Sequence, residues 1–149
     1  MIFERMKDVR EYFDKTQIEM ANILKVSRST YAGWENGIDL IPLLKLNEFC
    51  NYFGICLDYI CGLTNIKKYE IVNFEINKIV LGQNIKNIRI KSNDTQENVA
   101  KTIGVDQSNY SKYELGKILI HTYPLIEFAK YYNVSIDWLC GKTKNLEIR

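Results

Sequence analysis

The stretch VSRSTYAGWENG at residues 26–37 returns as VDQSNYSKYELG at residues 105–116, at an offset of 79 residues. The same offset relates the flanking positions without a gap, and 18 of the 49 residues from Thr16 to Thr64 are identical to their counterparts. A chain of 149 residues ordinarily suggests one domain, but an internal repeat of this kind indicates two similar units. Each unit has about 65 residues, a size that folds alone with only marginal stability.

Helix boundaries can be read most clearly in the second copy. Isoleucines at helical spacing predict a first helix from Asn77 to about Lys91. Thr95 stands where the N-cap of a short second helix belongs, and Gly104, which tolerates a positive φ, ends that helix. In the first copy the corresponding start, at residues 16–19, also has the spacing of a capping box.

A third helix follows after a tight turn. Asp106 is expected to cap it, as Ser27 does in the first copy, and two short helices joined in this way form a helix-turn-helix motif. An apolar stripe over residues 125–132 predicts a fourth helix, and a short fifth helix is expected to stop at Gly141. The sequence shows no strand pattern of any length, so the predicted fold class is all-α.

The repeat predicts unit 1 at residues 1–65, a linker at residues 66–76 and unit 2 at residues 77–149. The predicted architecture is therefore two tandem five-helix units joined by a short, partly apolar linker. The linker is too apolar for a free tether. Four of its residues are expected to pack on one or both units: Tyr69, Ile71, Phe74 and Ile76.

The composition is that of a globular protein, with 46% hydrophobic and 26% charged residues. The net charge of +2 is unevenly spread, because residues 1–65 hold 7 basic and 9 acidic residues whereas residues 66–149 hold 13 and 9. A polyanion is therefore attracted more strongly to the second half. The chain has no run of 18 apolar residues and its first residues do not resemble a secretion signal, so a cytoplasmic protein without membrane contact is expected.

Candidates for catalysis or metal binding are scarce. The four cysteines contain no C-x2-C pair, and we expect free thiols packed in the core rather than zinc ligands. The single histidine, His121, has no recurring Ser, Cys or Asp partner, and no phosphate-binding glycine loop occurs. The sequence therefore predicts no enzyme activity, no metal and no cofactor.

Several features present in both copies resemble the lambda-repressor/Cro-like (XRE) helix-turn-helix transcription regulators. They are Thr-Gln at the start of the second helix, Ala four residues on, Val in the turn, Glu and Gly separated by one residue, and a closing Asp-aromatic-Leu/Ile-x-Gly. The resemblance covers roughly residues 4–64 and 79–143. It implies two lambda-repressor-like units that bind double-stranded DNA, with recognition helices near residues 27–35 and 106–114 in the major groove.

The resemblance also implies which side chains meet the DNA. The family contacts bases from the first exposed turns of the recognition helix, which here correspond to Arg28, Ser29, Gly33, Gln107, Ser108 and Lys112. It contacts phosphates from the start of the second helix and from the end of the third, which here correspond to Gln17, Asn36, Gln96 and Lys117. The chemistry agrees, because Arg28 can donate two hydrogen bonds to guanine and Gln107 can form two with adenine.

Other residues of the recognition helices are expected to face inward. DNA would repel the carboxylates of Glu35 and Glu114, so we expect structural ion pairs with Arg10 and Arg89, which recur at the same offset. The aromatic residues of both helices are expected to pack beneath them rather than to stack on bases.

Two functional hypotheses remain open. The first is a sequence-specific DNA-binding transcriptional regulator, a repressor of phage, mobile-element or toxin–antitoxin type, that binds as a covalent pseudo-dimer or as a homodimer. The second is a protein-interaction or dimerisation adaptor, antitoxin-like, that uses the same fold with unit 1 not reading DNA. Unit 1 departs from the family pattern, because it is acidic and continues after its third helix with the apolar segment 38–44.

Overall fold

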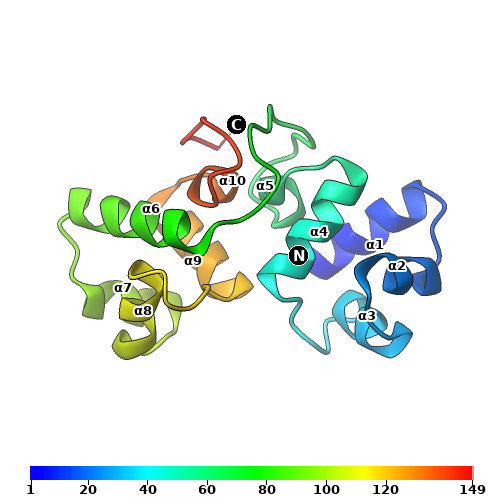
Figure 1. Ribbon diagram of the computed structural model, residues 1–149, viewed down its shortest axis with the longest axis horizontal. Coiled ribbons are helices and arrows are strands. Elements are labelled where there is room, and N and C mark those ends of the chain that lie inside the picture. Colours follow the sequence, from blue (N-terminus) through cyan, green and yellow to red (C-terminus); the bar gives the residue numbers. More distant parts are fainter. Residues whose placement is uncertain (149) are drawn as a thin grey trace. The chain divides into compact units, whose positions relative to one another are not determined.

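The computed structural model describes residues 1–148, which form ten helices and no strand (Figure 1). The all-α fold class is therefore confirmed. The helices fall into two compact units, with unit 1 at Met1–Lys68 and unit 2 from Tyr69 onward. Unit 1 contains α1 (Ile2–Tyr12), α2 (Gln17–Leu24), α3 (Arg28–Glu35), α4 (Leu43–Phe53) and α5 (Leu57–Ile60). Unit 2 contains α6 (Lys78–Lys91), α7 (Gln96–Ile103), α8 (Gln107–Glu114), α9 (Thr122–Tyr132) and α10 (Ile136–Leu139).

Short polar side chains fix where the helices of each motif begin. Thr16 and Glu19 form a capping box at the start of α2, and the hydroxyl of Thr95 accepts a hydrogen bond from the backbone N–H of Asn98 at the start of α7. At the third helices, Ser27 Oγ accepts from the N–H of Thr30 and Asp106 Oδ1 from that of Asn109. These caps satisfy N–H groups that no helix can satisfy internally.

A residue in the left-handed conformation ends the second helix of each unit. In unit 2 it is Gly104, with φ of 78°, as the sequence predicts. In unit 1 it is Lys25, with φ of 58°. A lysine adopts this conformation only at a cost of about 1–2 kcal/mol, so the surrounding turn must hold it there. The turns lead from α2 to α3 and from α7 to α8, and complete the two helix-turn-helix motifs (Figure 1).

Each unit has its own hydrophobic core at matching positions of the repeat. Tyr31 and Tyr110 are both fully buried, as are Phe49 and Phe128. The next aromatic residue of α9, Tyr131, is by contrast 55% exposed. All four cysteines are buried thiols, so they contribute to packing.

The segment after the last short helix folds back on its own unit in both copies. The backbone N–H of Cys56 donates to the carbonyl of Lys67, and that of Ser135 donates to the carbonyl of Leu146, each at 2.8 Å. These four residues are related by the 79-residue offset. The structural repeat therefore extends further towards the C-terminus than the sequence identities, and each copy includes its own closing segment.

This closing segment shifts the boundary between the units. Residues 66–68, expected in the linker, lie on unit 1, and the N–H of Val72 donates to the carbonyl of Lys142 within unit 2 at 2.8 Å. Of the four linker residues expected to pack on one or both units, Tyr69, Ile71 and Ile76 are partly buried and Phe74 is 61% exposed.

The first helix approaches the recognition helix differently in the two units. A Cβ placed on Gly82 of α6 would overlap the carbonyl oxygen of Tyr113 and lie 2.7 Å from that of Glu114. The helices thus cross in direct backbone contact at the end of α8. The corresponding residue in unit 1 is Phe3, whose ring lies against Gly37.

None of the helices in residues 1–148 is long and apolar enough to cross a membrane.

Candidate nucleic-acid interface

A buried ion pair fixes the inner side of each recognition helix. Arg10 Nε donates to Glu35 Oε2 at 2.7 Å and Nη2 donates to Oε1 at 3.0 Å. In unit 2, Arg89 Nε and Nη2 donate to the Glu114 carboxylate at 3.0 and 2.8 Å. The side chains of Glu35 and Glu114 are only 1% and 2% exposed. Both expected pairs are present, and two parallel hydrogen bonds define the position of each carboxylate.

The same arginines also hold the loop that precedes the second helix. Arg10 Nη1 donates to the carbonyl of Lys15 at 2.8 Å, and Arg89 Nη1 donates to that of Asp94 at 3.0 Å. One guanidinium in each unit therefore connects the first helix, the start of the second and the end of the third. This arrangement keeps the two helices of the motif at a fixed separation.

The electrostatics of the pair keep both partners charged. Burial, the largest single influence, acts to raise the pKa of Glu35, but the hydrogen bonds that the carboxylate accepts, those from Arg10 foremost, and the charge of Arg10 together hold that pKa below its ordinary value. The hydrogen bonds to the glutamates raise the pKa of Arg10 and of Arg89. Because each carboxylate is neutralised by its guanidinium, neither acid adds an uncompensated negative charge near the outer face of its helix.

The outer face of α8 is polar and open. Gln107, Ser108 and Lys112 are exposed, and the side chains of Gln107 and Lys112 have no hydrogen-bond or ion-pair partner among residues 1–148. On the opposite side of the same helix, Tyr110 and Tyr113 are buried. The helix therefore presents free donors and acceptors outward while its aromatic residues anchor it to the core.

Unit 1 presents a smaller polar face. Arg28 and Ser29 are exposed at the start of α3, and the Arg28 guanidinium has no partner among residues 1–148. Gly33, expected to contact bases, is instead buried. The reason is Asp39, whose carboxylate lies so close that a Cβ on Gly33 would be 2.6 Å from Asp39 Oδ2. The expectation for Gly33 is corrected accordingly, since the place where a base edge would approach is occupied by a carboxylate.

The residues expected to contact phosphates lie in two kinds of environment. Gln17 Nε2 donates to Glu35 Oε1 at 3.3 Å, and Gln96 Nε2 donates to Glu114 Oε2 at 3.4 Å. Both glutamines are half-buried, so their amides are oriented by the ion pairs. Asn36 and Lys117 are exposed just after the recognition helices.

A second cation beside Lys117 was not anticipated from the sequence. Lys78 Nζ donates to the backbone carbonyl of Lys117 at 3.4 Å, which brings the first residue of α6 to the end of α8. No spacing rule identifies such a contact, since the two residues are 39 positions apart.

Within residues 1–148 no group of three or more His, Cys, Asp or Glu residues is arranged to hold a metal ion.

Comparison with known proteins places this geometry in a family. A helix-turn-helix family model matches the chain twice, at residues 6–60 and 85–139, which together make up more than half of it. The two matches contain α2–α3 and α7–α8, respectively. No solved structure matches the chain.

Three curated proteins are similar to parts of the chain. The cryptic phage CTXphi transcriptional repressor RstR of Vibrio cholerae is 37% identical over 60 residues, which cover 40% of this chain and 54% of RstR. The HTH-type transcriptional regulator ImmR of Bacillus subtilis is 36% identical over 62 residues, which cover 42% and 49%. Antitoxin PezA of Streptococcus pneumoniae is 29% identical over 75 residues, which cover 48% of each chain. The chain thus spans about half the length of the curated relatives it matches.

Proposed function

The chain belongs to the XRE-type helix-turn-helix family, and on this basis we propose that it binds double-stranded DNA sequence-specifically and regulates transcription. The observation that carries the proposal is the exposed polar face of α8, opposite the buried Arg89–Glu114 pair. A helix inserted in the major groove must present unpaired polar groups on a rigid support, because base edges are read by hydrogen bonds of fixed direction.

The proposed base contacts follow from side-chain chemistry. The amide of Gln107 both donates and accepts, which suits N6 and N7 of adenine, and the ammonium of Lys112 suits O6 and N7 of guanine. The hydroxyl of Ser108 is compatible with more than one base. In unit 1, Arg28 and Ser29 are the corresponding candidates, of which Arg28 can form two parallel hydrogen bonds with guanine.

The proposed phosphate contacts lie on either side of α8. Gln96, held by Glu114, is at the N-terminus of α7, where backbone N–H groups also favour an anion. Lys117 and Lys78 supply two positive charges at the other end of α8. In unit 1 we propose Gln17 and Asn36 for the same role. Contacts at both ends would fix the position of the helix along the groove.

We further propose that unit 2 is the stronger DNA-binding unit. Its recognition helix carries Lys112 where unit 1 has the covered Gly33, and Lys117 stands where unit 1 has Ile38. At the position of Asp39, unit 2 has an isoleucine. Unit 1 therefore lacks these two cations and adds one carboxylate, but it has Arg28 in place of Gln107 and Ser27 in place of Asp106. The balance leaves unit 2 with one more positive charge at these positions, which strengthens its attraction to phosphates.

The role proposed for the whole protein is transcriptional repression in the cytoplasm, without catalytic activity or a cofactor. Two of the similar proteins are named as a repressor and as a transcriptional regulator, which supports this role. Homodimerisation is part of the proposal, because a homodimer would present two α8 helices to successive turns of the groove, about 34 Å apart. The predicted binding site is then a two-fold symmetric sequence.

Selection of binding sites from random duplexes by the full-length chain tests the proposal. We expect a defined motif with inverted half-sites, and we expect the variant Gln107→Ala to lose selectivity at one base position in each half-site. Recovery of no motif, with only weak retention that disappears at moderate salt, would rule out sequence-specific binding. A motif without symmetry would instead contradict the homodimer and leave the base contacts intact.

A second candidate function is a protein-interaction adaptor that acts through unit 1. The specific observation is the apolar surface beside α3, where Ile38, Leu40 and Leu44 are 76%, 65% and 51% exposed. The similarity to a protein named as an antitoxin supports this alternative. It is favoured over DNA binding if the random-duplex selection fails while the chain elutes as a defined oligomer that Leu40→Asp dissociates.

A further inference from the structure

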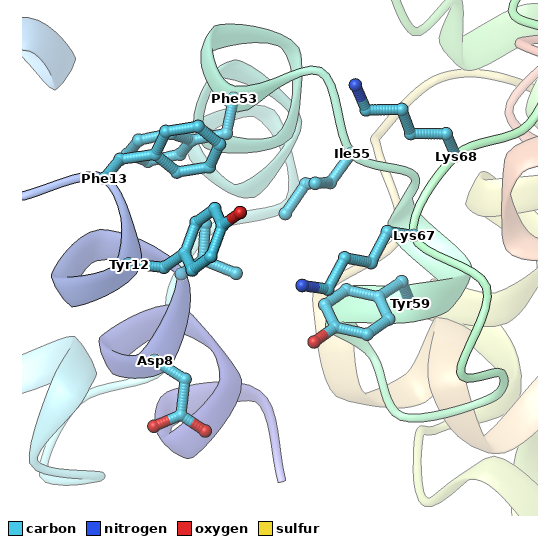
Figure 2. Close-up of a pocket in the computed structure, with 9 residues that line it drawn as sticks. Asp8, Tyr12, Phe13, Phe53, Ile55, Tyr59, Lys67 and Lys68 are labelled. Carbon is cyan, nitrogen blue, oxygen red and sulfur yellow. The ribbon is translucent and has the colours of Figure 1, made fainter.

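Unit 1 contains a pocket of about 440 Å³ whose lining includes no residue of α2 or α3 (Figure 2). Four aromatic residues line it: Tyr12, Phe13, Phe53 and Tyr59. They come from the end of α1, the end of α4 and helix α5. A pocket of this volume with mainly apolar walls matches the size and lining of small-molecule sites in proteins.

The aromatic walls are held in place by one another. The rings of Phe13 and Phe53 are stacked, with centroids 4.9 Å apart and planes at 25°. Tyr12 meets Phe13 edge-on at 5.1 Å. Offset-stacked and edge-to-face pairs are the favoured arrangements of aromatic rings. The walls therefore need little rearrangement to receive a flat molecule.

Two lysines give the pocket its charge. The ammonium of Lys67 extends into the space between the two tyrosines, 5.1 Å from the ring centroid of Tyr12 and 5.8 Å from that of Tyr59 (Figure 2). Lys68 also lines the pocket. Neither lysine forms an ion pair within residues 1–148, although the carboxylate of Asp8 is at the edge of the same pocket. The positive charge of Lys67 is thus held at an aromatic site without a neutralising carboxylate.

The same positions in unit 2 have a different chemistry. Lys91 and Ser92 stand in place of Tyr12 and Phe13, and Leu146 stands in place of Lys67. Tyr132, which stands in place of Phe53, donates its hydroxyl hydrogen to Asp94 Oδ2 at 2.6 Å. Two of the four aromatic walls and the lysine are therefore specific to unit 1, although the backbone fold of the two units is alike.

We propose that this pocket binds a flat aromatic molecule that carries a single negative group, such as a carboxylate or a sulfonate. The aromatic ring lies within the pocket, where it gains contact with the apolar walls. The anionic group pairs with the ammonium of Lys67. A cationic aromatic molecule is excluded, because its charge would lie beside that of Lys67, and Asp8 disfavours a second negative group.

Calorimetric titration of the full-length chain tests the proposal with three probes of one ring system. Naphthalene-2-sulfonate is the anion, 2-naphthol is neutral and 2-naphthylmethylamine is the cation at neutral pH. We expect one site per chain for the sulfonate, at least fivefold weaker binding of 2-naphthol and no detectable binding of the amine. Binding of the amine as tightly as the sulfonate would refute the charge selectivity.

Variants at exposed positions identify the site without disturbing the fold. Lys67→Gln is expected to weaken binding of the sulfonate at least tenfold and to leave that of 2-naphthol unchanged. Tyr12→Ala is expected to weaken both. Lys7→Gln removes the same charge from an exposed position of α1 outside the pocket and is the matched control. Equal affinities of Lys67→Gln and Lys7→Gln for the sulfonate would refute the assignment.

Methyl NMR signals locate the bound probe independently of affinity. Val9 and Ile55 line the pocket, and Ile88 and Val134 are their counterparts in unit 2. The sulfonate is expected to shift the first pair and not the second. A shift confined to unit 2 would overturn the proposal. These measurements do not depend on DNA binding, so their outcome is separate from that of the site selection.

Discussion

The carboxylate of Asp39 covers the backbone of Gly33, so that a Cβ at residue 33 would lie 2.6 Å from Asp39 Oδ2. This contact places a negative charge on the face of α3 that would approach DNA. We expect Asp39→Asn to tighten binding of the full chain to duplex DNA by roughly 1 kcal/mol, about fivefold, in a titration at low salt. Glu48→Gln, an exposed change on α4 of the same unit, is the control. No gain from Asp39→Asn would mean that unit 1 does not approach the DNA.

Gln107 is the central residue of the proposed base readout. Gln107→Ala should cost about 1–3 kcal/mol on a selected site and relax one base position, because one pair of directed hydrogen bonds is lost. Arg28→Ala, the change at the corresponding position of unit 1, should cost less if unit 2 is the stronger unit. A competition titration with point-substituted sites measures both. Equal losses would contradict the proposed division between the units.

The two lysines at the end of α8 should determine the salt dependence of binding. Lys117→Gln and Lys78→Gln should each lower the slope of log K against log salt concentration by about one, because each removes one phosphate contact. Both variants should weaken binding to all DNA sequences to a similar extent. Lys130→Gln on α9, where the lysine is 3.9 Å from Glu127, should leave the slope unchanged. An unchanged slope for Lys78→Gln would remove that residue from the proposed interface.

The Arg10–Glu35 pair predicts an acid-sensitive stability for unit 1. The folded-state pKa of Glu35 lies below the ordinary value of 4.5, so the carboxylate stabilises the fold above that pH. This contribution is lost as the pH falls through the lower folded-state pKa. Glu35→Gln should cost about 3 kcal/mol at neutral pH, because it leaves the Arg10 guanidinium without its charged partner.

Denaturant titrations between pH 3 and pH 7 measure this effect. The difference in unfolding free energy between the wild type and Glu35→Gln should narrow as the pH falls. Glu48→Gln, which alters a 52% exposed side chain, should have nearly the same unfolding free energy as the wild type at every pH. A constant difference across the pH range would show that ionisation of Glu35 is not the source of the stability.

Most of the fold could be predicted from local signals. Caps such as Thr95 and Asp106, a glycine such as Gly104 and the apolar spacing of the helices are properties of neighbouring residues, and they set the helix boundaries. Lys25 shows the limit of this reasoning, because no local rule predicts that a lysine adopts the left-handed conformation. Its conformation follows from the shape of the turn that the repeat shares.

The candidate site could be predicted only where exposure follows from helical spacing. The spacing of α8 indicated that Gln107 and Lys112 are exposed while Tyr110 is buried. Gly33 was misassigned, because the residue that covers it lies in the following loop and the path of that loop has no sequence signature. The contact of Lys78 with Lys117, 39 residues apart, depends in the same way on tertiary packing.

The crossing of α6 over the end of α8 at Gly82 limits which helices can be exchanged between the two units. Because backbone meets backbone there, α8 has its orientation fixed by a residue that carries no side chain. Phe3 is the residue of α1 that corresponds to Gly82, and its side chain would not fit against the backbone of α8. In a chimera with α1 in place of α6, α8 would therefore have to tilt. The first helices of the two units are therefore not interchangeable, although the sequences of the units correspond at many positions.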